Sequence, residues 1–254
     1  MDVADALLLL AAGLAAGGVN ALAGGGSLVS FPALLATGLP PVAANVSNSI
    51  SVCPGYLASV YGSRADLRGE RRTAYELLPT TAAGTAVGCA ILLLTPARAF
   101  ELVVPFLVLG AAATLALQGR LRRIVGHPHE LSHRRRRLYL HLLAGLGAVY
   151  GGYFGAALGV VLVAVLALVI EERMAGISAL KNVLAAVVGL MTAVVFGLFG
   201  PVHWLSVLVL APATIAGGYL GARLTRQLPS AVLRWVIVGY GTVIGLVLLV
   251  RAFA

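Results

Sequence analysis

Apolar stretches alternate with short polar ones along the chain, and their lengths predict helices that cross a membrane. Six of these stretches lie at residues 42–62, 75–94, 100–117, 177–199, 204–222 and 231–250. Each comes close to the roughly 20 residues that a helix needs to span the hydrocarbon core. Two more, residues 3–38 and 138–170, are too long for one crossing and contain clustered glycines. The pattern therefore predicts an all-α polytopic membrane protein.

The glycines predict that both long segments are broken helices. The first is interrupted by Gly24, Gly25 and Gly26, and the second by Gly151, Gly152, Gly155 and Gly159. In lipid an unpaired backbone group costs several kcal/mol, so a break is tolerated only inside protein or beside a cavity. Each segment can be a re-entrant hairpin or a pair of crossings, and the sequence leaves both open. Because half-helix N-termini in transporters offer free N–H groups to anions, the breaks predict a binding site.

Composition excludes a soluble globular protein. The 254 residues are 60% hydrophobic and only 11% charged, whereas about 25% charge is usual in soluble domains. The net charge of +9 would suggest nucleic acid in a soluble protein, but here it is explained by basic cytoplasmic loops. We therefore expect the lipid bilayer as a partner and no nucleic acid. Asp2 and Asp5 stand where a cleavable signal peptide would need positive charge, so none is predicted.

The second half of the sequence repeats the first. A shift of 134 residues aligns Asn48 with Asn182, and it aligns the glycine pair at 17–18 with the pair at 151–152. We predict a first transmembrane repeat at residues 1–119, a basic cytoplasmic linker at 120–137 and a second repeat at 138–254. Each repeat has a glycine-broken first segment followed by three transmembrane helices.

The placement of Lys and Arg predicts that the two repeats are inverted. Cytoplasmic loops carry the excess of these residues, so the linker with its seven Arg is assigned to the inside. Inverted repeats then place 15 basic residues inside and 2 outside, whereas parallel repeats place 12 inside and 5 outside. The inverted arrangement puts both termini outside and the loops at residues 63–73, 118–137 and 227–234 inside.

One ionisable residue, Lys181, stands inside an apolar span. All nine acidic residues fall in loops or at segment ends, which argues against a cation transporter and against a carboxylate proton relay. A charge in a span costs about 2.5–3.5 kcal/mol on insertion scales and normally faces a cavity or a partner. Lys181 is followed by Asn182, and its repeat mate is Ser47. The alternative is that Lys181 snorkels to the membrane surface.

The candidate substrate site combines polar side chains and glycine amides from both repeats. These groups donate hydrogen bonds that suit the oxygens of a small anion. For Asn45 and Asn48 the alternative is that they join helices, and for the glycines that they permit close packing. The predicted substrate-binding residues are Asn20, Gly24, Gly25, Gly26, Ser27, Asn45, Ser47, Asn48, Tyr150, Tyr153, Lys181 and Asn182.

The sequence predicts no enzyme, cofactor or metal site. Cys53 and Cys89 lie in apolar segments without metal-ligand spacing, and we expect them to be small core residues. Histidines at 127, 129 and 133 lie in the Arg-rich linker, an unsuitable setting for a metal. The spans hold no acid–base carboxylate pair, and the three consecutive glycines lack the Lys-Ser/Thr ending of a phosphate-binding loop.

Two sequence blocks resemble the TauE/SafE family of sulfite-exporter-like membrane permeases. The first is NALAGGGSLVSFPALLATGLPPVAANVSNSISVCPG, and the second combines YGGYFGAALG at Tyr150–Gly159 with ALKN at Ala179–Asn182. The resemblance covers residues 7–250. It implies a permease for sulfite, an organosulfonate or a related sulfur-containing anion, whereas the physical reasoning alone reaches only a small anion.

We therefore predict a secondary transporter, resident in the plasma (inner) membrane, that binds its anion at the midplane between the repeats. The alternative is a non-transporting membrane subunit or scaffold whose polar residues only hold helices together. An interior-negative membrane potential drives an anion outward with about 2.3 kcal/mol per charge per 100 mV. Export therefore needs no coupling ion, but the sequence leaves the direction, the coupling ion and a homodimer open.

Overall fold

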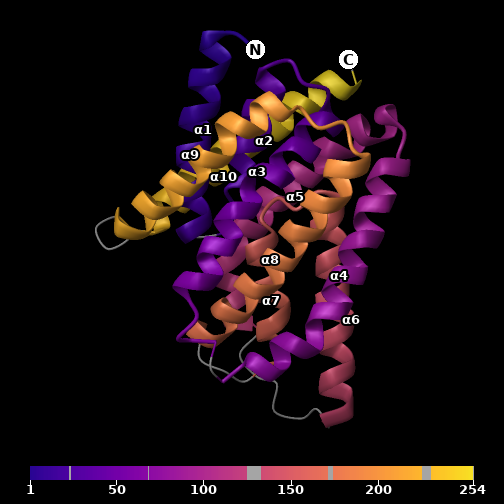
Figure 1. Cartoon of the computed structure of the whole chain (residues 1–254), viewed down its shortest axis with the longest axis vertical. Coiled ribbons are helices and arrows are strands. Elements are labelled where there is room, and N and C mark those ends of the chain that lie inside the picture. The colour runs from indigo at the N-terminus through magenta and orange to yellow at the C-terminus, as the bar shows by residue number, and fades with distance from the viewer. Residues whose placement is uncertain (23, 68, 125–132, 171–173, 225–229, 254) are drawn as a thin grey trace.

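The chain is a bundle of α-helices (Figure 1). A computed structural model describes all residues except 23, 68, 125–132, 171–173, 225–229 and 254. The described residues form ten helices and no strand. The helices are α1 (Val3–Leu22), α2 (Ser27–Ala36), α3 (Pro41–Gly62), α4 (Arg71–Leu94), α5 (Ala97–Ile124), α6 (His133–Tyr153), α7 (Leu158–Ala167), α8 (Met174–Phe199), α9 (Trp204–Leu224) and α10 (Ser230–Phe253).

The prediction of an all-helical, polytopic membrane protein is confirmed. Within the described parts of the chain, five helices contain stretches long and apolar enough to cross a bilayer: Val3–Asn20, Arg71–Leu94, Ala97–Leu117, Ala175–Phe199 and Trp235–Phe253. The two long segments are each split into a longer and a ten-residue helix, α1 with α2 and α6 with α7. The first interruption contains all three predicted glycines, whereas the second contains only Gly155, because Gly151 and Gly152 lie in α6 and Gly159 lies in α7.

Helix α3 is too polar for lipid, and the fold surrounds its polar half with other helices. Asn45, Ser47, Asn48 and Ser51 are all at most 1% exposed. Burying polar groups is tolerated only when they are hydrogen-bonded or hydrated. Helices α2, α8 and α9 supply the surroundings by packing against α3. The most polar of the predicted spans therefore lies at the centre of the bundle.

The main helix contacts join the two halves of the sequence. Helix α1 packs most extensively against α9, and α4 packs against α6; α3 pairs with α8, and α5 with α10. Because α1 corresponds to α6 and α4 to α9 under the 134-residue shift, the first two contacts are equivalents of each other. This reciprocal pattern is what a two-fold relation between the halves would produce.

The two halves also begin at opposite ends of the molecule. The N-terminus and the C-terminus both lie at the top of Figure 1, whereas the first turns of α6 lie at the bottom. Helix α1 therefore starts from one end of the bundle and α6 from the other.

The described helices cover both ends of the segment predicted as a linker. Helix α5 continues to Ile124 and α6 begins at His133, so only residues 125–132 of the predicted linker at 120–137 lie outside the described residues. Arg-rich helix ends can extend beyond the hydrocarbon because water solvates their charges. The predictions for Arg68, Arg173 and Arg226, for His127 and His129, and for residues 227–229 of the predicted 227–234 loop also fall outside the described residues. The rest of that loop prediction is wrong, because α10 already begins at Ser230.

One residue at the second break has a backbone conformation that its side chain disfavours. Ala157 precedes α7 with φ of 55°, the only positive φ among the described non-glycine residues. The left-handed region costs an L-residue about 1–2 kcal/mol. Ala157→Gly should therefore raise the melting temperature of the detergent-solubilised protein by about 2–4 °C. Ala156→Gly is the matched control and should lower it; an equal response of both variants would contradict this assignment.

Candidate functional site

The two breaks touch each other inside the bundle. A Cβ added to Gly24 would lie 3.0 Å from the Cα of Gly159, and Gly24 has φ of 78°. Any larger residue at Gly24 would therefore meet both a strained backbone and the opposite chain. The sequence predicted the two breaks separately, and the structure brings them together at one point.

Side chains from the predicted site hold the breaks in shape. Asn20 accepts a hydrogen bond from the Gly26 amide at 2.9 Å, which satisfies a donor at the start of α2. Tyr150 donates its hydroxyl proton to the Ala156 carbonyl in the second break. Asn45 donates to the Tyr153 carbonyl at 2.9 Å. The Gly26 amide, predicted to bind the anion, already serves Asn20.

Three predicted residues line one large cavity, which we call the Lys181 cavity. Asn20, Lys181 and Asn182 contribute to a space of about 530 Å³ between α1, α3, α8 and α9. Ligand sites typically measure about 300–1,000 Å³. The remaining lining residues, all small or polar except Ile215, are Gly17, Gly55, Ala58, Ser59, Gly62, Ser63, Ser178, Thr214, Ile215, Gly218 and Tyr219.

Lys181 lies both in this cavity and beside the contact between the two helix breaks. A Cβ added to Gly159 would lie 3.5 Å from the Lys181 Cδ, so the lysine stem runs beside the glycine that meets Gly24. Next to it, the Asn182 amide donates to the Ser63 hydroxyl at 3.0 Å and toward the Ser59 carbonyl at 3.4 Å. Lys181 is half-buried and lines a cavity that contains several hydrogen-bonding groups.

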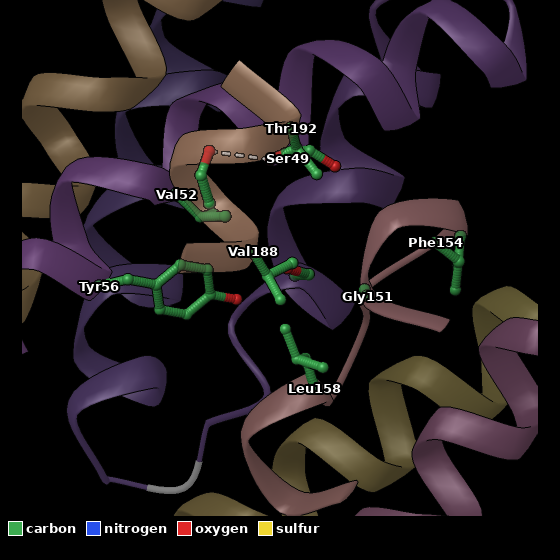
Figure 2. A pocket seen from close by; sticks show the side chains of 11 residues that line it. Ser49, Val52, Tyr56, Gly151, Phe154, Leu158, Val188 and Thr192 are labelled. Atoms are coloured by element: carbon green, nitrogen blue, oxygen red, sulfur yellow. Dashed lines mark hydrogen bonds between the residues drawn. The ribbon is translucent and has the colours of Figure 1, made fainter. Parts of the chain in front are cut away.

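A second, much smaller space lies further along α3 and α8, and we call it the central pocket. Its free volume is about 10 Å³, about that of one water molecule. Its polar lining comes from Ser27, Ser49, Tyr56 and Thr192. Figure 2 shows Tyr56 projecting across the pocket toward Val188. Ser27 is the only residue of the predicted site that lines it.

Three predicted site residues in the first half of α3, namely Asn45, Ser47 and Asn48, lie away from both spaces. Asn48 accepts a hydrogen bond from Ser30, and Ser47 accepts one from the His203 amide at 2.9 Å. Neither these residues nor Asn45 line the Lys181 cavity or the central pocket. Gly25 packs against α5, where an added Cβ would lie 3.3 Å from Leu115. The Tyr153 ring packs edge-on against Phe100 at 5.8 Å.

The sequence analysis did not identify the partly polar face in the C-terminal half of α3. Tyr56, Ser59 and Ser63 all line one of the two spaces, and their spacing of three and four residues places them on one side of a helix. That periodicity was a readable signal. It was obscured because the denser polar cluster at residues 45–51 drew the assignment toward the other half of the helix.

The bond between Ser30 and Asn48 leads to a prediction about stability. Both residues are at most 1% exposed, so Asn48→Ala leaves the Ser30 hydroxyl without this partner and should cost about 1–3 kcal/mol. The sequence-based hypothesis expected a loss of substrate affinity instead. Thermal melting and flux of Asn48→Ala, Ser30→Ala and the double variant separate the two. An unchanged melting temperature with weaker affinity would contradict the structural role.

The chain is similar to one known protein family and to several membrane proteins. The profile described as sulfite exporter TauE/SafE matches residues 9–248. A probable membrane transporter protein of Haemophilus influenzae is 26% identical over 241 residues, which is 94% of this chain and 92% of that protein. The probable membrane transporter protein YfcA of Escherichia coli K12 is 27% identical over 232 residues, covering 88% and 81%. No solved structure gave a significant match.

Proposed function

The chain belongs to the sulfite exporter TauE/SafE family, and from that premise we propose that it is a secondary permease for a small anion. Its helices and its relatives are those of a multi-pass membrane transporter. The proposed substrates are sulfite, an organosulfonate or a related sulfur-containing anion. The proposed location is the inner membrane.

The Lys181 cavity is the observation that carries this proposal. An ammonium group has three donors, and Asn20 and Ser178 add an amide and a hydroxyl group to the same cavity. A charge within a span normally marks a substrate or ion pathway. A pyramidal or tetrahedral oxyanion is the ligand chemistry that such a set of donors fits.

We also propose that the two halves are inverted repeats with the linker in the cytoplasm and both termini outside. The reciprocal helix contacts support this arrangement, as do the opposite starting ends of α1 and α6. In secondary transporters built this way, broken helices from the two repeats meet near the midplane around the substrate. The proposed counterpart in this protein is the contact between Gly24 and Gly159.

Flux measurements in proteoliposomes test the function. Purified protein is reconstituted, a potential of either sign is imposed, and uptake of radiolabelled sulfite is compared with that of ethanesulfonate, sulfate and chloride. We expect saturable flux of sulfite or an organosulfonate that responds to the sign of the potential. Flux no greater than that of empty liposomes for every anion would overturn the proposal and favour a non-transporting subunit.

A further inference from the structure

The described residues that correspond to the Lys181 cavity in the other repeat enclose no comparable cavity, because side chains fill the space between them. Under the 134-residue shift, Lys181 corresponds to Ser47, Asn20 to Phe154 and Gly62 to Phe196. The three residues of the cavity are partly or fully exposed, whereas Ser47, Phe154 and Phe196 are at most 2% exposed. The structure is thus open at the Lys181 cavity and closed at the equivalent place in the other repeat. We call that closed place, around Ser47, Phe154 and Phe196, the filled region.

The central pocket lies between the open and the closed side. Helix α3 lines the pocket with Ser49, Val52 and Tyr56 and the cavity with residues from Gly55 onward. Helix α8 also lines both spaces, with Thr192 at the pocket and Lys181 at the cavity. Its chain direction is opposite, because the residue at the cavity comes first in the sequence. The seam between α3 and α8 therefore runs from the Lys181 cavity through the central pocket toward the filled region.

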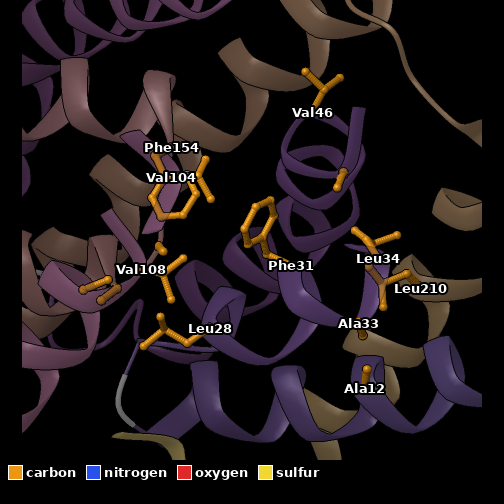
Figure 3. Packing of buried hydrophobic residues seen from close by; sticks show 14 of the residues in the cluster. Ala12, Leu28, Phe31, Ala33, Leu34, Val46, Val104, Val108, Phe154 and Leu210 are labelled. Carbon is orange, nitrogen blue, oxygen red and sulfur yellow. The ribbon is translucent and has the colours of Figure 1, made fainter. Parts of the chain in front are cut away.

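Four aromatic side chains, which we call the aromatic plug, close the filled region: Phe31, Phe100, Tyr153 and Phe154. The Phe31 and Phe154 rings meet edge-on with centroids 5.3 Å apart, and Phe100 contacts Phe154 at 6.5 Å. Figure 3 shows Phe31 facing Phe154 and Val104 across the core. The plug residues come from α2, from α5 and from the end of α6 with its break. Phe154 connects the plug to the central pocket, because it lines that pocket too.

A polar atom without a hydrogen-bond partner is buried beside the plug. Among the side chains that the structure describes, the buried N and O atoms lacking a hydrogen bond are Asn45 Oδ1 and Thr81 Oγ1. Asn45 is bound through its amide to Tyr153 of the plug. Thr81 lies on α4, which contributes no side chain to the plug. The unpartnered Asn45 oxygen costs about 1–3 kcal/mol unless it is hydrated, and hydration requires the region to open.

We propose that the filled region is the outer half of the substrate path and that the aromatic plug is its gate, shut in this structure. The path runs from the Lys181 cavity along the α3–α8 seam, through the central pocket and past Phe154 to Ser47 and Asn45. When the plug separates, water and the anion reach these polar groups, while the Lys181 side closes. This inference rests on the proposed permease function and on the inverted repeats.

Accessibility to a membrane-impermeant thiol reagent tests the gate. The buried free cysteines Cys53 and Cys89 are first replaced with alanine, and Ser47→Cys serves as the reporter on the closed side. Phe154→Ala and the milder Phe154→Leu loosen the plug. The matched controls are Phe106→Ala and Phe106→Leu, because Phe106 is 56% exposed and is not part of the plug. Ser178→Cys, labelled from the inside, reports that each variant is folded.

We expect both Phe154 variants to raise the external labelling rate of the Ser47→Cys reporter by about 10-fold or more, with no change in the Phe106 variants. A reporter that stays protected in Phe154 variants whose Ser178→Cys site still reacts would overturn the gate, as would equal acceleration by the Phe106 variants. Labelling does not depend on which anion is carried. Absence of sulfite flux would therefore overturn the substrate assignment and leave the gate standing.

Discussion

Replacing Lys181 with methionine is expected to reduce anion flux by roughly 30-fold or more, because losing one member of a desolvated charge contact costs about 2–5 kcal/mol. Lys181 is the only lysine in the chain, and it lines the large cavity beside the contact between the two breaks. Methionine keeps the length of the side chain while removing its charge. Protein level and melting temperature should therefore remain close to those of the parent. Flux in proteoliposomes is the measurement.

Two further variants test whether flux requires a positive charge at position 181 or depends only on the total charge of the protein. Lys181→Arg should keep part of the flux, because the charge survives while the compact ammonium becomes a planar guanidinium. Arg72→Met removes a charge from a side chain that is 92% exposed and should leave flux unchanged. Normal flux through the Lys181→Met variant, at parental expression, would show that the lysine is a membrane-surface anchor and would remove the central residue of the proposed site.

The largest effect on stability is expected from glycines at the two tightest helix contacts. A Cβ at Gly88 of α4 would lie 2.1 Å from the Val149 carbonyl oxygen of α6, and one at Gly217 of α9 would lie 2.1 Å from the Leu14 carbonyl oxygen of α1. Both obstacles are backbone atoms, which cannot move aside as a flexible side chain can. Gly88→Val and Gly217→Val should each cost at least about 1–3 kcal/mol, the usual penalty for overpacking. Thermal melting followed by size-exclusion chromatography in detergent measures the loss.

Gly110→Val provides the matched control for these variants. Gly110 lies inside a helix, as the two contact glycines do, but nothing lies within 4 Å of an added Cβ. Its substitution should leave the elution profile and the melting temperature nearly unchanged. If the Gly110 variant were as unstable as the other two, the losses would reflect valine in a helix rather than close helix packing.

Most of the helices could be predicted from the sequence, because their lengths follow from the thickness of the bilayer. The breaks were also predictable, because several glycines close together weaken a continuous helix. What the sequence could not supply was the pairing of helices. Nothing in the residues around Gly17 indicates that their neighbours are on α9, since contacts between distant segments depend on how all the apolar faces fit together.

The candidate site was predictable in part for the same reason. Lys181 could be identified because a charge in an apolar span is costly, and Asn182 because it is adjacent. Asn45 and Asn48 share the same polar character but point toward the helix breaks and Ser30. Composition cannot distinguish an amide that binds a ligand from one that binds a neighbouring helix. That difference depends on which side of α3 each residue occupies.

The exchange of partners between the halves has a consequence for biosynthesis. The principal neighbour of α1 is α9 and that of α6 is α4, so the first half cannot complete its packing when it leaves the ribosome. Until α9 has been inserted, the face of α1 that carries Gly13 and Gly17 lacks the helix against which it packs. The early chain is therefore expected to remain loosely associated in the bilayer, and its packing is completed only when the penultimate helix arrives.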